Sequence, residues 1–143
     1  MTTLQQQELS LKNACVSFMF AYQQRDVNKM LSFCDPEGEV HFEAIGDEGK
    51  GKIGELGRAL WTSIIECFPN VDNTVDAAVA EDGDTIRCQV VIRGTQAKDF
   101  AGIVNKGKSF DSDHIFIFRL NDQGRIDKIN ISWDHDDFQR QLS

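Results

Sequence analysis

The sequence has little positive charge and no long apolar run, and each shortage excludes a class of protein. Its 143 residues include 15 lysines and arginines against 23 aspartates and glutamates, which gives a formal net charge of -8. Nucleic acids and anionic membrane surfaces are bound mainly through positive charge, so we expect neither as a partner. No segment approaches the ~20 consecutive apolar residues of a membrane-spanning helix, so we predict a soluble protein that does not bind a membrane.

The sequence also lacks linkers, repeats and low-complexity segments. Proline occurs only at Pro36 and Pro69, and no stretch has the Pro- or Ser-rich composition of a linker. A chain of this length usually forms one domain, and we predict a single domain over residues 1–143. A domain of this size buries roughly 68% of its unfolded surface, which is enough to build a core that encloses a pocket.

The four cysteines form no CxxC pair and no zinc-binding spacing with the three histidines. Cys15 and Cys67 fall on apolar faces of predicted helices, so we expect reduced core thiols in a cytoplasmic protein. The sequence contains neither a GxxxxGK[ST] phosphate loop nor a GxSxG nucleophile motif. The run Asp134-His135-Asp136 lacks the spacing of a metal site. We therefore expect no cofactor, either nucleotide or metal.

Hydrophobic periodicity predicts helices mainly in the first half of the chain and strands mainly in the second. Helices are expected over residues 8–25, 27–33 and 53–68, and strands over residues 39–45, 71–80, 85–94, 110–120 and 125–133. Residues 35–38 are expected to break the chain, residues 46–51 to form a loop and residues 121–124 to form a hairpin turn. The helices would then cover one face of a curved antiparallel sheet, which is an α+β fold.

Four segments of the sequence stand out together: Phe68-Pro69-Asn70, EDGDTIRCQVVIRGT at 81–95, IFIFRLNDQGRIDKI at 115–129 and DFQRQLS at 137–143. In this combination the chain resembles the SnoaL-like polyketide cyclases of the nuclear-transport-factor-2-like superfamily, which also includes ketosteroid isomerases and limonene epoxide hydrolases. The resemblance spans nearly the whole chain. It implies a cone-shaped, bent mixed sheet packed on three helices around a deep, mostly apolar pocket. It also implies a homodimer that pairs through the outer face of the sheet.

The resemblance places Ile131, Phe116 and Gln96 where the family has polar groups. The catalytic aspartate of the cyclases follows a turn glycine by seven positions, and counting from Gly124 leads to Ile131. A histidine of the preceding strand corresponds to Phe116, and the histidine of a frequent Gly-Thr-His corresponds to Gln96. Asp134 matches a second aspartate of the family pattern. We expect all three replaced positions to contact a ligand, but an isoleucine cannot move a proton, so proton transfer needs another residue.

Strand alternation indicates His114 as the candidate proton donor or acceptor. It lies two residues before Phe116, so both side chains project from one face of the strand, and imidazole titrates near neutral pH. Asp111 or Asp113 could orient it; the alternative role is a hydrogen-bonded histidine at the pocket rim. Asp134 is a second candidate base, with the alternative role of a structural cap.

Four further side chains could contact a ligand. Tyr22 and Trp61 each carry a polar tip on a large apolar body, so they could contact a planar ligand or pack in the core. His41 lies on the first predicted strand and either lines the pocket or faces solvent. Arg93 could pair with a ligand carboxylate or enolate, or form a salt bridge on the exterior.

The sequence therefore predicts a pocket protein, similar to SnoaL-like cyclases and isomerases, that acts on an apolar oxygenated small molecule by acid/base proton transfer. The alternative is a non-catalytic ligand-binding protein, which the isoleucine at position 131 favours. A third hypothesis is an interaction module that binds a partner through the outer face of its sheet.

Overall fold

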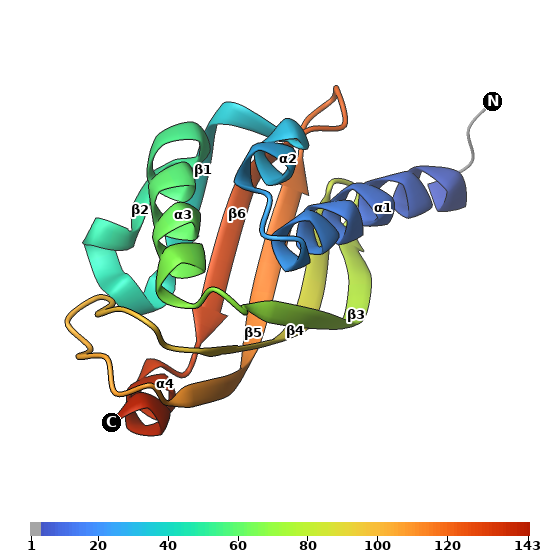
Figure 1. The fold of residues 1–143 in the computed structure, drawn as a ribbon. Helices are drawn as coiled ribbons and strands as arrows, with labels where there is room; N and C mark the ends of the chain where they lie inside the picture. The colour runs from blue at the N-terminus through green and yellow to red at the C-terminus, as the bar shows by residue number, and fades with distance from the viewer. Residues whose placement is uncertain (1–3) are drawn as a thin grey trace.

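The computed structural model describes residues 4–143 and places a layer of helices on one face of a bent six-stranded sheet (Figure 1). The helices are α1 (Leu4–Gln23), α2 (Val27–Ser32), α3 (Arg58–Cys67) and α4 (His135–Leu142). The strands are β1 (Cys34–Phe42), β2 (Lys50–Lys52), β3 (Asp72–Asp82), β4 (Thr85–Thr95), β5 (Ser109–Leu120) and β6 (Ile126–Trp133). Their order is β2-β1-β6-β5-β4-β3, with β1 and β6 parallel and the other neighbours antiparallel. The predicted α+β class, with helices on a curved mixed sheet, is confirmed.

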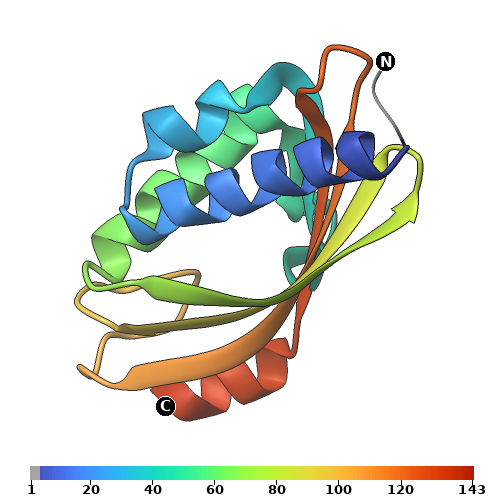
Figure 2. The ribbon, with the colours of Figure 1, turned by 90° about the vertical axis from the view of Figure 1, so that its right-hand side faces the viewer.

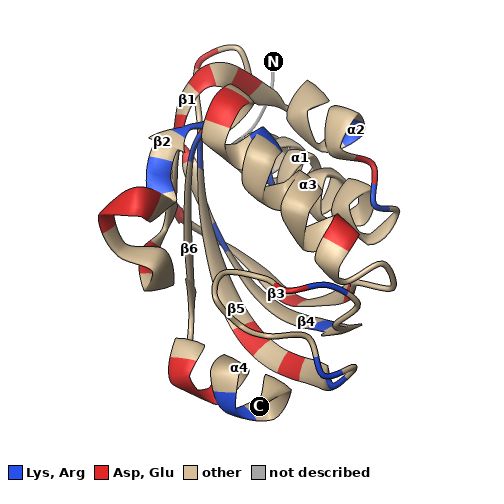
Figure 3. Ribbon diagram, turned by 60° about the vertical axis from the view of Figure 1, so that its left-hand side comes forward, with Lys and Arg blue, Asp and Glu red and all other residues tan. Residues whose placement is uncertain are grey.

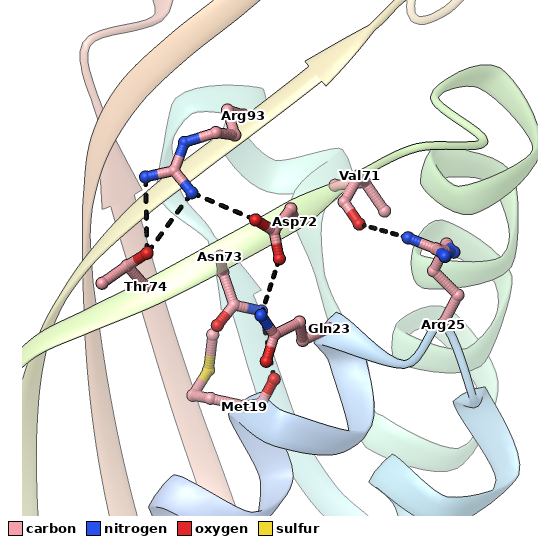
Figure 4. Close-up of polar contacts among 8 residues, drawn as sticks. All are labelled: Met19, Gln23, Arg25, Val71, Asp72, Asn73, Thr74 and Arg93. Carbon is pink, nitrogen blue, oxygen red and sulfur yellow. Dashed lines mark hydrogen bonds and ion pairs between the residues drawn. The ribbon is translucent and has the colours of Figure 1, made fainter.

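Helix α1 buries one face against the sheet. Its buried side chains recur at the spacing of an amphipathic helix; they are Cys15, Phe18, Met19, Ala21 and Tyr22. Two side-chain bonds join its C-terminal end to β3 (Figure 4). Asn73 Nδ2 donates to the Met19 carbonyl oxygen at 3.0 Å, and Gln23 Nε2 donates to Asp72 Oδ1 at 2.8 Å.

Trp61 of α3 links the helical layer to the sheet. Its ring meets Phe18 of α1 edge-on at 5.3 Å and Phe42 of β1 at 5.7 Å. Phe18 in turn meets Phe118 of β5 at 5.5 Å. Trp61 is 1% exposed, and truncating a buried aromatic side chain of this kind to alanine costs about 3–5 kcal/mol.

The structure differs from the sequence prediction around β1. Residues 35–38 belong to β1, but its ladder with β6 skips them: Cys34 pairs with Ile126, and pairing resumes at Glu39 with Lys128 after a register shift. Gly38 permits this course, because a Cβ atom there would lie 2.4 Å from the Asp127 carbonyl oxygen. The predicted strand over 39–45 ends at Phe42, and a 3-10 segment, Glu43–Gly49, leads into β2, whose first two residues lie in the predicted loop over 46–51.

The predicted helix over 53–68 is divided, with a π-turn at Ile53–Gly57 before α3. Here the chain passes close to β1: a Cβ atom on Gly54 would lie 2.8 Å from Cβ of Pro36. The glycine therefore permits a close approach of the helical layer to the sheet.

Helix α4 lies apart from the other helices, against β5 (Figure 2). Strand β6 ends at Trp133, opposite His114, so the first residues of β5 have no strand partner on that side. Gln141 of α4 fills the gap: its Oε1 accepts from the Asp111 backbone N–H at 2.8 Å and its Nε2 donates to the Asp111 carbonyl at 3.0 Å. A side-chain amide thus replaces one step of the strand ladder.

Charged residues are distributed over many elements, β5 and α4 among them (Figure 3). Within residues 4–143, no helix is long and apolar enough to cross a membrane.

Candidate functional site

An apolar cavity of about 50 Å³ lies between the helical layer and the inner face of the sheet. Helices, strands and the loop between β4 and β5 all contribute to its wall, which consists of Tyr22, Phe42, Ile45, Leu60, Trp61, Ile64, Phe68, Ile92, Phe100, Phe110, His114, Phe116, Ile131, Trp133 and Phe138. Among the residues that the structure describes, no aspartate, glutamate, lysine or arginine lines it. The cavity is therefore an uncharged, largely aromatic space with very few polar atoms.

His114 is the ionisable side chain that strand alternation on β5 directs into this space. The burial of β5 alternates along its length, and His114 is 8% exposed. Its Nδ1 lies 3.1 Å from the Ser112 carbonyl oxygen. A carbonyl can only accept, so Nδ1 carries the proton and Nε2 keeps its lone pair. Within residues 4–143, Nε2 has no hydrogen-bond partner.

Burial lowers the pKa of His114 to about 4, against the opposing effects of the Ser112 carbonyl and the Asp113 charge. The imidazole is therefore neutral at pH 7. The expected orienting role of Asp111 or Asp113 is taken by the Ser112 carbonyl, which bonds to the ring directly.

Trp133, which was not among the predicted site residues, covers one face of the His114 ring. The two rings are stacked, with centroids 5.3 Å apart and planes inclined by 21°. Trp133 Nε1 donates to His135 Nδ1 at 3.2 Å. Strand alternation could have identified Trp133, because it lies two residues after Ile131 and so projects from the same face of β6.

Phe116 and Ile131 are direct partners across the β5–β6 ladder. They are 1% and 2% exposed, and both line the cavity. The wall is thus hydrocarbon at two of the positions where the family resemblance places polar groups.

Tyr22 and Trp61 also line the cavity, from α1 and α3. Tyr22 is 3% exposed, and burial raises the pKa of its phenol above the ordinary value, so it remains a protonated donor. Five predicted site residues are therefore brought together here: Tyr22, Trp61, His114, Phe116 and Ile131.

Arg93 and His41 lie on strand positions that face away from the cavity. Arg93 follows Ile92, which lines the cavity, so its side chain projects from the other face of β4. There it forms an ion pair with Asp72 at 3.2 Å and a hydrogen bond with Thr74 at 3.3 Å (Figure 4). His41 lies between the inward-facing Val40 and Phe42 of β1 and is half-buried. The structure therefore places Arg93 in an exterior salt bridge and His41 on the outer face of the sheet, rather than in the cavity wall.

Gln96 and Asp134 are also outside the cavity wall. Gln96 is 2% exposed, but its Nε2 donates to the carbonyls of Lys98 and Ile103, so it organises the loop between β4 and β5. Asp134 is exposed and caps α4, where its Oδ1 accepts from the Asp137 N–H at 3.0 Å. Within the described part of the chain, no three His, Cys, Asp or Glu side chains are placed to hold a metal ion.

The family model for SnoaL-like polyketide cyclase matches residues 14–142. No curated protein compared with the chain matches it in sequence.

Solved structures match over almost the whole chain. A Jannaschia sp. CCS1 protein assigned to the SnoaL-like polyketide cyclases superposes with a TM-score of 0.83 at 17% identity, covering 94% of this chain and 92% of its own. TsrD from Streptomyces laurentii gives 0.80 at 23% identity, covering 94% and 96%. A Xanthomonas campestris pv. campestris protein assigned as a polyketide cyclase gives 0.81 at 14% identity, covering 96% and 99%. At these identities the matches establish the shared fold.

Proposed function

Because the chain belongs to the SnoaL-like polyketide cyclase family, we propose that it acts on an apolar, oxygenated small molecule by acid/base proton transfer, with His114 moving the proton. The observation that carries this proposal is the neutral imidazole of His114, which lines an uncharged cavity and whose Nε2 lone pair is unpaired within residues 4–143. Such a nitrogen can accept a proton from an enol, a phenol or a carbon next to a carbonyl.

The low pKa of His114 fits a ligand that becomes negatively charged during the reaction. An imidazole with a pKa of about 4 is a weak base in the free protein. An enolate forming beside it would favour the imidazolium, because opposite charges attract strongly where water is excluded. The pKa of His114 would then rise as the enolate forms, which is the step in which the imidazole accepts the proton.

Tyr22 supplies the complementary group. Its phenol keeps its proton because burial raises its pKa, so it could donate to a carbonyl or enolate oxygen of the ligand. The aromatic walls suit a planar ligand. The ligand should carry no charge before it reacts, since no cationic side chain among the described residues lines the cavity to offset a carboxylate.

The cavity must enlarge for this function. Its volume of about 50 Å³ is well below the roughly 300–1,000 Å³ of sites for drug-sized ligands. Phe100, on the loop between β4 and β5, is a half-buried part of the wall. We propose that this loop moves outward when a ligand binds.

Solvent exchange into a simple ketone tests the proposal. We would incubate the protein in D2O with 1-tetralone, a neutral planar aryl ketone, and measure carbon-bound deuterium by mass spectrometry. Wild type should accelerate the exchange over buffer, and His114→Phe should lose about 100-fold or more of that acceleration. His41→Gln, outside the cavity, is the matched control. Equal acceleration by His114→Phe would refute the role of His114.

A non-catalytic ligand-binding protein is the second candidate function. The hydrocarbon pair Phe116 and Ile131 favours it, because these positions cannot move a proton. Apolar burial alone would then hold the ligand, at roughly 25 cal/mol per Å² before binding costs. Binding of 1-tetralone without any exchange would support this candidate over the enzyme.

We also propose a cytoplasmic homodimer of single domains spanning residues 1–143. Support for pairing through the outer sheet face comes from Val91, Ile115 and Ile117, which are apolar and only half-buried there. Support for a reducing compartment comes from the four cysteines, all free and buried. Light scattering of Ile117→Lys beside wild type tests the dimer, and only the variant should be monomeric.

A further inference from the structure

We propose that Trp133 is the positioning residue for His114 and that His135 holds Trp133 in place. The inference rests on the proposed role of His114 in proton transfer, but its geometry can be tested without any ligand. The contacts run from α4 through the end of β6 to β5.

His114 needs such a support because its own hydrogen bonding is sparse. Nδ1 is held by the Ser112 carbonyl at 3.1 Å, and this single bond leaves the ring free to tilt about it. The indole of Trp133 covers one ring face, with centroids 5.3 Å apart and planes 21° from parallel. The other ring neighbour, Phe116, is farther away at 6.5 Å and is inclined by 35°. Trp133 therefore sets the plane of the imidazole and shields it from water.

Trp133 is itself fixed by a bond that only one form of His135 can make. An indole N–H can only donate, so His135 Nδ1, 3.2 Å away, must be unprotonated. The His135 ring is then stacked on Phe138 of α4, with centroids 5.8 Å apart and planes inclined by 18°. The N-terminal turn of α4 thus fixes Trp133, and through it His114.

Few titratable or charged groups surround these rings. Asp113 is the charged neighbour of His114 on β5, and Val90 stands opposite it on β4. Tyr22 of α1 lines the same cavity. Asp134 and Asp136 flank His135 in the sequence, and within residues 4–143 neither bonds to its ring.

The test compares two replacements of His135 by imidazole NMR of His114. His135→Asn keeps an acceptor near the position of Nδ1, whereas His135→Leu removes it. Wild-type His114 should stay neutral between about pH 5 and pH 8, because its pKa is about 4. In His135→Leu, Trp133 should move away and admit water, so the His114 pKa should rise by about one unit or more toward the ordinary 6.5. The upfield ring-current shift of the His114 Hε1 signal should shrink in the same variant.

His135→Asn should resemble wild type in both signals, and Trp133→Leu should resemble His135→Leu. If His135→Leu leaves the pKa and the ring-current shift of His114 unchanged, the inference is wrong. It is also wrong if the Asn and Leu variants change both signals equally, because the acceptor then has no role. These readouts need no substrate, so absence of tetralone exchange in wild type would remove the proposed function and leave this positioning intact.

Discussion

His114 and Trp133 face each other across the β5–β6 ladder, and the next inward-facing pair is Phe116 with Ile131. On this wall of the cavity, the ionisable ring of His114 is therefore only two residues along β5 from the hydrocarbon pair Phe116 and Ile131. Because no charged side chain among the described residues lines the cavity, the protonation state of His114 depends chiefly on burial. Two changes at single residues test this arrangement.

Replacing Ile131 by aspartate should destabilise the protein strongly. Ile131 is 2% exposed, and an unpaired buried carboxylate costs about 3–5 kcal/mol. Burial would raise the folded-state pKa of the new carboxyl, so its contribution to stability falls as pH rises above the unfolded value near 3.9. Urea unfolding should therefore show a larger loss at pH 8 than at pH 5.

Ile131→Asn, which is polar but uncharged, is the control for this change. Its loss of stability should be smaller at pH 8 and nearly independent of pH. A stable aspartate variant would mean that position 131 does not face the cavity.

His114 should make wild-type stability depend on pH. Its folded-state pKa of about 4 lies below the unfolded value near 6.5, so the unfolded chain binds the extra proton first. The stabilisation from the neutral ring is fully present above about pH 6.5 and is lost as pH falls toward 4. Between pH 7 and pH 5 the loss should be about 2 kcal/mol.

His114→Phe should lack this part of the pH dependence, and His41→Gln should keep it. Denaturant unfolding at the two pH values measures it. Parallel pH profiles for wild type and His114→Phe would show that the imidazole is hydrated in the folded state.

At the scale of elements, α4 acts as a substitute strand and as part of the cavity wall. Phe138 packs on Phe110 with ring centroids 4.8 Å apart, and both line the cavity. Gln141 bonds to both backbone groups of Asp111. Packing of α4 against β5 therefore supplies hydrogen-bond partners to the strand where β6 has ended, and it completes part of the cavity wall.

Gln141→Ala should loosen this junction. Loss of the paired amide bonds should cost about 1–2 kcal/mol and leave the Asp111 amide without its acceptor. Hydrogen exchange should then show reduced protection at Asp111, while amides in the middle of β5 keep theirs. Gln139→Ala, exposed on the same helix, should change neither quantity, and unchanged protection at Asp111 in Gln141→Ala would contradict the substitute-strand role.

Periodicity was sufficient to predict the elements with long regular patterns, including α1 and strands β3 to β6. It failed around β1, where the Asp35–Gly38 segment has turn composition but lies inside a strand, between Cys34 and Glu39, which both pair with the sequence-distant β6. Strand alternation located His114, whereas the family resemblance located Phe116 and Ile131. Arg93 illustrates the limit of alternation: the strand period puts Arg93 and Ile92 on opposite faces of β4, but which face lines the cavity depends on packing against the rest of the fold.

At the scale of the whole molecule, acidic residues are spread over many elements (Figure 3). Among the residues described, no charged side chain lines the interior cavity. The net charge of -8 favours solubility. Within residues 4–143, the charged residues that produce it do not line the cavity in which we propose proton transfer. The four predicted site residues outside the wall are His41, Arg93, Gln96 and Asp134. Asp134 and Gln96 bond locally, within the α4 cap and the loop between β4 and β5. Arg93 is instead held by an ion pair to Asp72 on the neighbouring strand.

Crystals under xenon pressure give the most direct test of the central claim, that an apolar cavity presents one neutral histidine. Apolar protein cavities stay dry and bind xenon. The account predicts a xenon atom in contact with Phe116, Ile131 and the His114 ring. Ordered waters hydrogen-bonded through that space, with no xenon, would contradict it.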